Sequence, residues 1–219
     1  MGALIAGGLL GEPPFLEWAV ASVALPGEVN SGDRHLVAPV GSGALLAAVD
    51  GLGHGDGAAL AADAAVSALY AHAGEPMVSL VGLCHEALRR TRGAVMSLVS
   101  LDAQSGSITW LGVGNVEAVL IRGDPHVRPP RETLAAIGGI VGVRLPRLRA
   151  FVLPANLGDK IVLATDGVRS SFPESIRPLE PAERLANRVI AGYASGTDDA
   201  LVLVANLRGA GGRGDRPTP

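Results

Sequence analysis

The chain has 219 residues, of which 48% are hydrophobic and only 3% aromatic, so its core has to be built from Ala, Val, Leu and Ile. Its 18 basic and 21 acidic residues give a net charge of −3, which argues against nucleic acid as a partner, because phosphates demand a strongly basic surface. A single cysteine, Cys84, excludes an intramolecular disulfide and a cysteine metal cluster, and it fits a reducing cytoplasm.

The two ends of the chain predict where it acts and how far its domain extends. The first ten residues are apolar, but they lack the basic flank of a signal peptide and are shorter than the roughly 20 residues of a membrane span. We therefore expect a cytoplasmic protein with no membrane attachment. Residues 209–219 cannot bury apolar surface and predict a disordered tail. No linker divides residues 1–208, which we expect to form a single domain.

The first part of the chain predicts two strands joined by a polar loop. Residues 18–25 predict a strand that is stopped by a Pro-Gly pair. The loop that follows, residues 27–35, carries two carboxylates, Glu28 and Asp33. The second strand is predicted over residues 44–50, where six apolar residues lead into an aspartate.

Asp50 ends this second strand in an unusual setting. Four glycines follow it at alternate positions, Gly51, Gly53, Gly55 and Gly57. The carboxylate is therefore expected on rigid structure beside exposed backbone carbonyls and amides, a place that suits a hard metal ion or a phosphoryl group. The plainer alternative is a tight strand-to-helix connection in which Asp56 only caps the helix.

The rest of the chain predicts helices and strands that do not alternate. Helices are expected over residues 58–73, 76–92 and 181–193, and strands over residues 94–101, 107–113, 117–122, 149–153, 160–165 and 200–207. Residues 123–146 contain four prolines and four glycines and are predicted to be irregular. A parallel βαβ fold would alternate, so this order indicates the α+β class, with antiparallel sheets and helices packed outside.

Acids stand at the ends of four apolar strands. They are Asp33 with Glu28, Asp50, Asp166, and the adjacent pair Asp198 and Asp199. Carboxylates gathered at strand edges repel one another unless a cation neutralises them. With no Cys cluster and no paired-His motif, oxygen ligands favour Mg²⁺ or Mn²⁺ over zinc. Two such ions about 3.5–4 Å apart can activate a shared water.

Five short motifs contain these acids. They are Gly-Asp at 32–33, Asp-Gly-x-Gly-x-Gly at 50–55, Gly-Val-Gly-Asn at 112–115, Ala-Thr-Asp-Gly at 164–167 and Asp-Asp-Ala-x-Val at 198–202. Their order and separations, from about residue 18 to residue 207, resemble those of the PPM (2C-like) metal-dependent serine/threonine phosphatases. The form of the glycine motif is closest to the bacterial branch of sporulation and stress-response regulators.

The resemblance implies an αββα sandwich of two antiparallel sheets flanked by helices, with a site for two Mn²⁺ or Mg²⁺ ions at one end. The implied ligands are Asp33, Asp50 as the bridging group, the Gly51 carbonyl, Asp166 and Asp198. Whether Asp198 or Asp199 is the ligand stays open, because many relatives have Asn at the position of Asp199. Glu28 is a further candidate, as a ligand or as a group behind the ligands.

The resemblance also implies a reaction and a substrate. The reaction is hydrolysis of phosphoserine or phosphothreonine by a metal-activated water, with no side-chain nucleophile. Arg34 is the candidate for holding the substrate phosphate, and His54 could donate a proton to a leaving oxygen. A flap insertion known from larger relatives is expected to be reduced or missing from residues 167–197. The implied partner is a phosphorylated STAS-domain protein of the stressosome scaffold.

Three alternatives are weighed against this interpretation. One is a phosphatase of an anti-sigma-factor antagonist in sporulation or general stress. Another is a catalytically weak pseudophosphatase that serves as a docking module, against which the intact acids argue. The third is a nucleotide-binding phosphate loop over residues 51–57; its P-loop form is excluded because no Gly-Lys-Ser/Thr follows these glycines.

Overall fold

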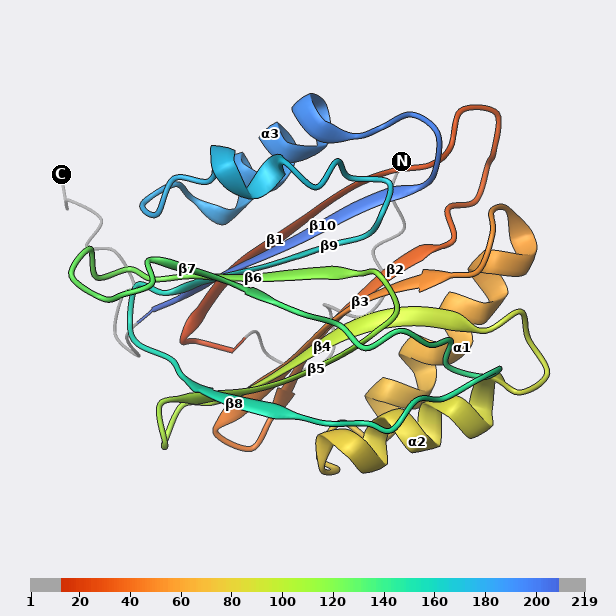
Figure 1. Ribbon diagram of the computed structural model, residues 1–219, viewed down its shortest axis with the longest axis horizontal. Helices are drawn as coiled ribbons and strands as arrows, with labels where there is room; N and C mark the ends of the chain where they lie inside the picture. Colours follow the sequence, from red (N-terminus) through yellow and green to blue (C-terminus); the bar gives the residue numbers. More distant parts are fainter. Residues whose placement is uncertain (1–12, 209–219) are drawn as a thin grey trace, which may run out of the picture.

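Two five-stranded antiparallel sheets lie face to face in the computed structural model, which describes residues 13–208 (Figure 1). The first sheet has the strand order β1 (Leu16–Val23), β10 (Ala200–Leu207), β9 (Lys160–Ala164), β6 (Glu117–Ile121), β7 (Arg131–Leu134). The second has the order β2 (Asp33–Val40), β3 (Gly43–Gly51), β4 (Ala94–Asp102), β5 (Ser107–Val113), β8 (Phe151–Pro154).

Helices cover the outer face of each sheet. Helix α3 (Ala182–Tyr193) lies over the first sheet, and helices α1 (Asp56–Ala71) and α2 (Met77–Leu88) lie over the second (Figure 1). A short 3₁₀ helix, η1 (Phe172–Ser175), precedes α3. The αββα sandwich implied by the resemblance is therefore confirmed. No helix in residues 13–208 is long and apolar enough to cross a membrane.

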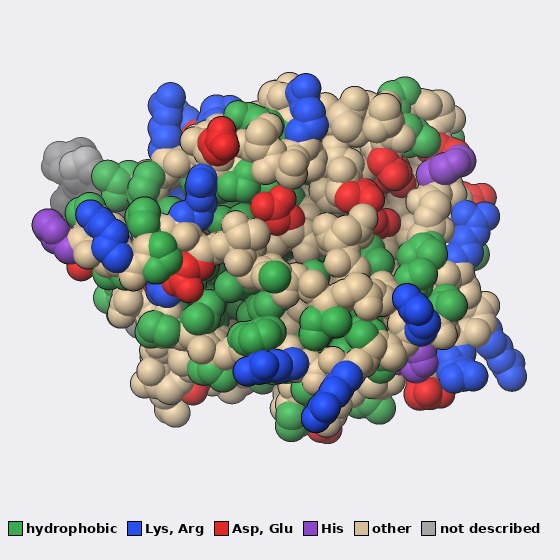
Figure 2. Space-filling view, viewed as in Figure 1, with side chains coloured by type: hydrophobic (Ala, Val, Ile, Leu, Met, Phe, Trp, Pro, Cys, Tyr) green, Lys and Arg blue, Asp and Glu red, His purple; other side chains and the backbone are tan. Residues whose placement is uncertain are grey.

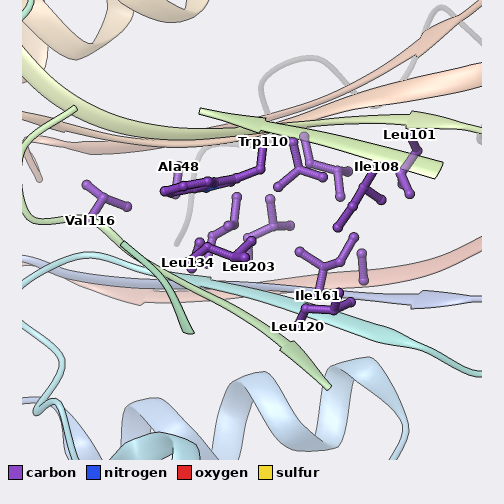
Figure 3. Packing of buried hydrophobic residues seen from close by; sticks show 14 of the residues in the cluster. Ala48, Leu101, Ile108, Trp110, Val116, Leu120, Leu134, Ile161 and Leu203 are labelled. Carbon is purple, nitrogen blue, oxygen red and sulfur yellow. The ribbon is translucent and has the colours of Figure 1, made fainter. Parts of the chain in front are cut away.

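The core is divided into three layers by the two sheets. The central layer contains Trp110 together with Leu, Ile, Val and Ala side chains from both inner faces (Figure 3). A second layer lies between the β2–β8 sheet and helices α1 and α2, and a third lies under α3. Because inner strands such as β3, β4, β9 and β10 are covered on both faces, their sequences are nearly continuous apolar runs.

Strand β3 shows how this burial positions the first acid of the glycine motif. Leu46 and Ala48 belong to the layer between the sheets, whereas Leu45 and Ala47 belong to the layer beneath the helices. Side chains alternate between the two faces of a strand. By this alternation Asp50 follows Ala48 and faces the space between the two sheets, at the end of the strand.

Two sequence-based predictions of local structure are wrong. Residues 33–35 are predicted in a loop, but they begin β2, which pairs with β3 in register from Asp33↔Asp50 to Val40↔Gly43. This polar segment is a strand because it pairs with the buried strand β3. His35 also packs against Trp18, with 6.1 Å between the ring centroids. The stretch 123–146 is predicted to be irregular, but it includes β7, of which only Leu134 is buried.

Other differences concern boundaries and the chain ends. Helix α2 ends at Leu88 and not near residue 92, and the chain then turns through Gly93, whose φ of +83° favours glycine. The remaining predicted helices and strands differ from the observed ones by one or two residues at most of their ends. The predicted absence of a signal peptide and the predicted disordered tail fall on residues 1–12 and 209–219, outside the described residues.

Candidate metal centre

The acids at the predicted strand ends come together at one end of the sandwich. The end of β3, the start of β2, the end of β9 and the start of β10 all lie there, on the right in Figure 1. Acidic side chains are visible toward this end of the molecular surface (Figure 2). The strands that contribute them belong to both sheets, so the sandwich itself brings these carboxylates close to one another.

Asp33 and Asp50 are direct neighbours across the β2–β3 ladder. Asp33 is only 4% exposed, and its Oδ2 accepts a hydrogen bond of 2.7 Å from the Thr165 hydroxyl. Burial, and then the charges of Asp199, Asp166 and Asp198, raise the pKa of Asp33 to about 7 against the effect of that hydrogen bond.

The pKa of Asp50 is raised further than that of Asp33. Burial, and then the charge of Asp33 followed by those of the other three acids, raise the pKa of Asp50 to about 8. Without a cation, the two neighbouring carboxylates are therefore held partly protonated near neutral pH. A divalent ion would remove both causes of the shift, since it compensates the lost hydration and the repulsion together.

Asp166 follows β9 at the molecular surface. Burial and then the charge of Asp198 raise its pKa, while its Oδ2 accepts a hydrogen bond of 2.7 Å from the Asn115 side-chain amide. Asn115 lies in the turn between β5 and β6, directly after Gly114. Gly114 has a φ of +99°, and a Cβ there would lie 2.2 Å from the Val95 side chain, so the turn requires glycine.

The adjacent acids Asp198 and Asp199 have different environments. Asp199 is 3% exposed, and its two carboxylate oxygens accept backbone hydrogen bonds from Leu25 N at 2.7 Å and Gly32 N at 2.6 Å. Asp198 is half-buried, and its Oδ1 accepts only from the Asp199 amide, at 2.8 Å. Asp199 therefore holds the β1–β2 connection against the start of β10, whereas Asp198 accepts no hydrogen bond from another described segment.

The glycine loop after Asp50 is tied to the β1–β2 connection by two polar pairs. His54 Nδ1 lies 2.6 Å from Glu28 Oε1, and the Asn30 side-chain amide donates to Asp56 Oδ1 at 2.9 Å. Asp56 therefore does not cap α1 with its side chain, and the cap residue is Gly55. Glu28 and His54 are engaged with each other rather than with Asp33 or Asp50.

Arg34 is also engaged in local contacts. Its Nε donates to Asp63 Oδ1 on α1 at 2.6 Å, and its Nη1 donates to the carbonyls of Ser31 and Asp33. The side chains of Arg34 and Asp63 are 25% and 49% exposed. The guanidinium is thus held on the α1 side of β2 by Asp63, and among the charges that shift the pKa values of Asp33 and Asp50 there is no arginine.

Three residues at this end are not predicted as site residues by the sequence. Asn115 and Thr165 each hold one of the carboxylates, and they stand inside the motifs Gly-Val-Gly-Asn and Ala-Thr-Asp-Gly. Arg92 donates to the His54 carbonyl at 3.3 Å and lies against Gly53 and Gly57. No local signal marks Arg92, because only the pairing of β3 with β4 brings it to the glycine loop.

The donor set suits a divalent metal in its chemistry. Four carboxylates and the Gly51 carbonyl are hard oxygen ligands, and burial together with the charges of neighbouring acids raises the pKa of Asp33, Asp50 and Asp166. No three His, Cys, Asp or Glu side chains within residues 13–208 are gathered closely enough to hold an ion as they stand.

One family model matches most of the chain, that of Stage II sporulation protein E (SpoIIE), over residues 41–208. A curated relative is the phosphoserine phosphatase RsbX of Bacillus subtilis (strain 168). RsbX is 22% identical over 199 residues, which cover 90% of this chain and 97% of RsbX. The similarity therefore extends over almost the full length of both proteins.

Several solved structures have the same fold. One is a chain from a study of the bacterial stressosome as a modular system adapted to control secondary messenger signalling. It is 30% identical, with a TM-score of 0.79 and coverage of 87% of this chain and 99% of that one. RsbX in complex with magnesium is 21% identical, with a TM-score of 0.78 and coverage of 88% and 95%. The Mycobacterium tuberculosis serine/threonine phosphatase PstP is 18% identical, with a TM-score of 0.71 and coverage of 89% and 99%.

The raised pKa values predict how stability depends on pH and metal. Folded Asp33 and Asp50 titrate near 7 and 8, so between about pH 4 and pH 8 the native state binds more protons than the unfolded state. Their contribution to stability is complete below about pH 4 and is lost as the pH rises to about 8. In EDTA, the melting temperature should fall by about 5 °C or more between about pH 5 and pH 8.

Millimolar Mn²⁺ at about pH 8 should restore the melting temperature, because the ion binds the native state. Asp50→Asn is the control, since its amide does not titrate and the pH dependence in EDTA should become shallower. A wild-type melting curve that Mn²⁺ leaves unchanged would contradict the metal site.

A matched pair of substitutions separates the roles of the two adjacent acids. Asp199→Ala leaves the amides of Leu25 and Gly32 without acceptors. Each unsatisfied amide should lower the free energy of unfolding by about 1–3 kcal/mol, observed as a lower melting temperature in EDTA. Asp198→Ala should leave that temperature equal or higher and should weaken Mn²⁺ binding in calorimetry. The reverse pattern would make Asp199 the ligand.

Proposed function

This chain belongs to the Stage II sporulation protein E (SpoIIE) family and is a PPM-type serine/threonine protein phosphatase, and we propose that it acts with two Mg²⁺ or Mn²⁺ ions. The proposed ligands are Asp33, Asp50 as the bridging group, the Gly51 carbonyl, Asp166 and Asp198. The observation that carries the proposal is the pair Asp33 and Asp50, opposed across one ladder with pKa values raised to about 7 and about 8.

The residues around the ligands have defined tasks in this proposal. When bound, the two ions would supply Lewis acidity, which lowers the pKa of a water and neutralises phosphoryl oxygens. Thr165 and Asn115 orient Asp33 and Asp166 through hydrogen bonds of 2.7 Å each. Asp199 fixes the loop that contains Gly32, and thereby the start of β2. No described side chain takes the part of a nucleophile, so hydrolysis is a single in-line step.

Arg34 remains the proposed residue for the substrate phosphate. Its pairing with Asp63 is partly exposed, and ion pairs of that kind are worth only about 0–1 kcal/mol. A phosphate can therefore replace Asp63 at little cost. His54 remains a candidate proton donor, and its contact with Glu28 would fix the ring beside the glycine loop.

We propose a phosphorylated STAS-domain protein of the stressosome scaffold as the substrate and the cytoplasm as the place of action. Two observations support this choice: RsbX is a phosphoserine phosphatase that matches this chain over almost its full length, and the chain from the bacterial stressosome study is 30% identical. Between Gly167 and Thr197 the only regular elements are η1 and α3, which leaves little chain for a flap. Substrate choice would then depend on the surface of a folded partner.

Asp50→Asn should abolish turnover of p-nitrophenyl phosphate in saturating Mn²⁺, with a loss of at least about 100-fold, because even groups behind metal ligands cost 10–100-fold when removed. Asp102→Asn is the matched control. Asp102 is an exposed aspartate opposite Gly43, at the other end of β3, and its removal should leave turnover unchanged. Wild-type turnover in Asp50→Asn would rule out the bridging assignment.

The substrate is tested by phosphorylating a STAS-domain scaffold with its cognate kinase, adding the enzyme with Mn²⁺, and following the intact mass. We expect loss of one phosphate mass, abolished by EDTA and by Asp50→Asn. A phosphorylated anti-sigma-factor antagonist serves as the competing substrate. Faster hydrolysis of the antagonist, or of unrelated phosphopeptides, would defeat the scaffold assignment while leaving the phosphatase intact.

A further inference from the structure

A stretch of three arginines lies outside the proposed metal centre. Arg144, Arg147 and Arg149, here called the arginine strip, are all exposed in the segment between β7 and β8. Within residues 13–208 none of the three forms an ion pair with a carboxylate, although the chain has more acids than bases. Positive charge is thus concentrated, without internal compensation, on one surface of a protein whose net charge is −3.

The arginine strip borders an apolar hollow. Arg147 and Arg149 line a cavity of about 530 Å³ together with Ile137 and Leu148, both half-buried. Basic side chains next to hydrophobic surface are visible on the lower half of the molecular face, where β8 and the segment before it lie (Figures 1 and 2). The hollow is half open to solvent, so a side chain presented on a partner's surface can reach it.

Further apolar surface continues from this hollow along β8, the edge strand of its sheet. Phe151 is 37% exposed and Val152 67% exposed. Phe151 stacks on buried Trp110 at 5.7 Å between ring centroids, and the Arg149 guanidinium lies 5.0 Å over the Phe151 ring. A cation–π contact orients the guanidinium without neutralising its charge, so Arg149 stays available to an anion.

The segment that presents the arginines is fixed at several points. Val141 exchanges two backbone hydrogen bonds with Ala94, and the Gly142 amide donates to His85 Nδ1 at 2.9 Å. Leu145 and Leu148 pack against the layer beneath α1 and α2, so the arginines between and beside them point outward. A surface held in this way loses little conformational freedom when it binds a partner.

The strip is also connected to the metal end. Ile137, which lines the cavity, bonds through its backbone to Gly112 and Gly114. Asn115 follows Gly114 directly, and its side-chain amide donates a hydrogen bond to Asp166 at the carboxylate cluster. A partner seated on the cavity therefore lies alongside the strand end that leads to the proposed metal centre.

We propose that the arginine strip and its cavity form a docking site for an acidic segment of the phosphoprotein substrate, with one aliphatic side chain of that segment in the cavity. The proposal rests on the proposed phosphatase function for the identity of the partner as a substrate. Arginine guanidinium groups bind carboxylates in bidentate pairs, which fits an acidic segment. Nucleic acid is disfavoured by the overall negative charge and by the apolar side chains of Ile137 and Leu148 in the cavity.

Binding is tested without catalysis, using a fluorescein-labelled peptide of sequence EDELEDE followed by anisotropy. We expect saturable binding that weakens with added salt, and at least about tenfold weaker binding by the double variant Arg147→Glu/Arg149→Glu. Arg184→Glu is the matched control. Arg184 is exposed on α3, which covers the other sheet, and this variant should bind like wild type. A second double variant, Arg144→Glu/Arg147→Glu, leaves the Arg149–Phe151 contact in place and should also weaken binding.

Each other outcome would overturn part or all of the proposal. No binding to the wild-type chain, or equal binding by both double variants, would refute the docking site. Equal affinity for a peptide in which Ser replaces Leu would refute the role of the cavity. Tighter binding of a 20-nucleotide single-stranded DNA, lost in the same variants, would make the strip a nucleic-acid site and not a protein site.

Turnover distinguishes failure of this proposal from failure of the proposed function. In Arg147→Glu/Arg149→Glu, kcat/KM for the phosphorylated STAS scaffold should fall at least about tenfold, whereas p-nitrophenyl phosphate hydrolysis should stay at the wild-type rate. An unchanged kcat/KM for the scaffold would refute docking and leave the phosphatase standing. Absent turnover of both substrates by the wild-type chain would refute the phosphatase, and the peptide experiment would still decide whether the strip binds acidic segments.

Discussion

The electrostatic repulsion among carboxylates at one end of the sandwich is the constraint on which the rest of the structure depends. Asp33 and Asp50 face each other across the β2–β3 ladder, where Asp33 is buried and Asp50 is half-buried. The hydrogen bonds from Thr165 and Asn115 limit the motion of Asp33 and Asp166. The fold therefore holds the charges together at a cost in stability that a divalent ion bound there would offset.

Much of the fold could be predicted from the sequence, because apolar runs and turn residues mark most strands and helices. The first site acid was recognisable for the same reason: an apolar run that ends in Asp50 and four alternate glycines is typical of a strand end that presents a carboxylate to a ligand. The two strands that the sequence analysis missed, β2 and β7, were missed for a common reason. β2 and β7 contain few buried residues of their own, and each is a strand only because a well-buried neighbour offers it hydrogen bonds.

The candidate site shows the same division between local and long-range information. Asn115 and Thr165 stand in recognisable motifs, yet their hydrogen-bond partners lie 51 and 132 residues away along the chain. The choice between Asp198 and Asp199 could not be made from sequence, since the two residues are adjacent and chemically identical. It depends on which carboxylate accepts hydrogen bonds from the backbone amides of Leu25 and Gly32, which are 174 and 167 residues earlier in the chain. Only tertiary structure supplies that information.

A phosphatase with little chain available for a flap needs another source of specificity, and the proposed docking site would separate that source from the chemistry. The carboxylates sit at strand ends that any phosphate can approach, so they distinguish one phosphoprotein from another poorly. The arginine strip lies on a segment fixed to α2, β4 and the end of β5, beside the site but outside it. Contacts there act equally on bound substrate and transition state, and so raise affinity for one partner without altering the hydrolytic step. On this proposal, substrate choice can change through the segment that carries the arginine strip, while the strand-end acids keep their positions in the two sheets.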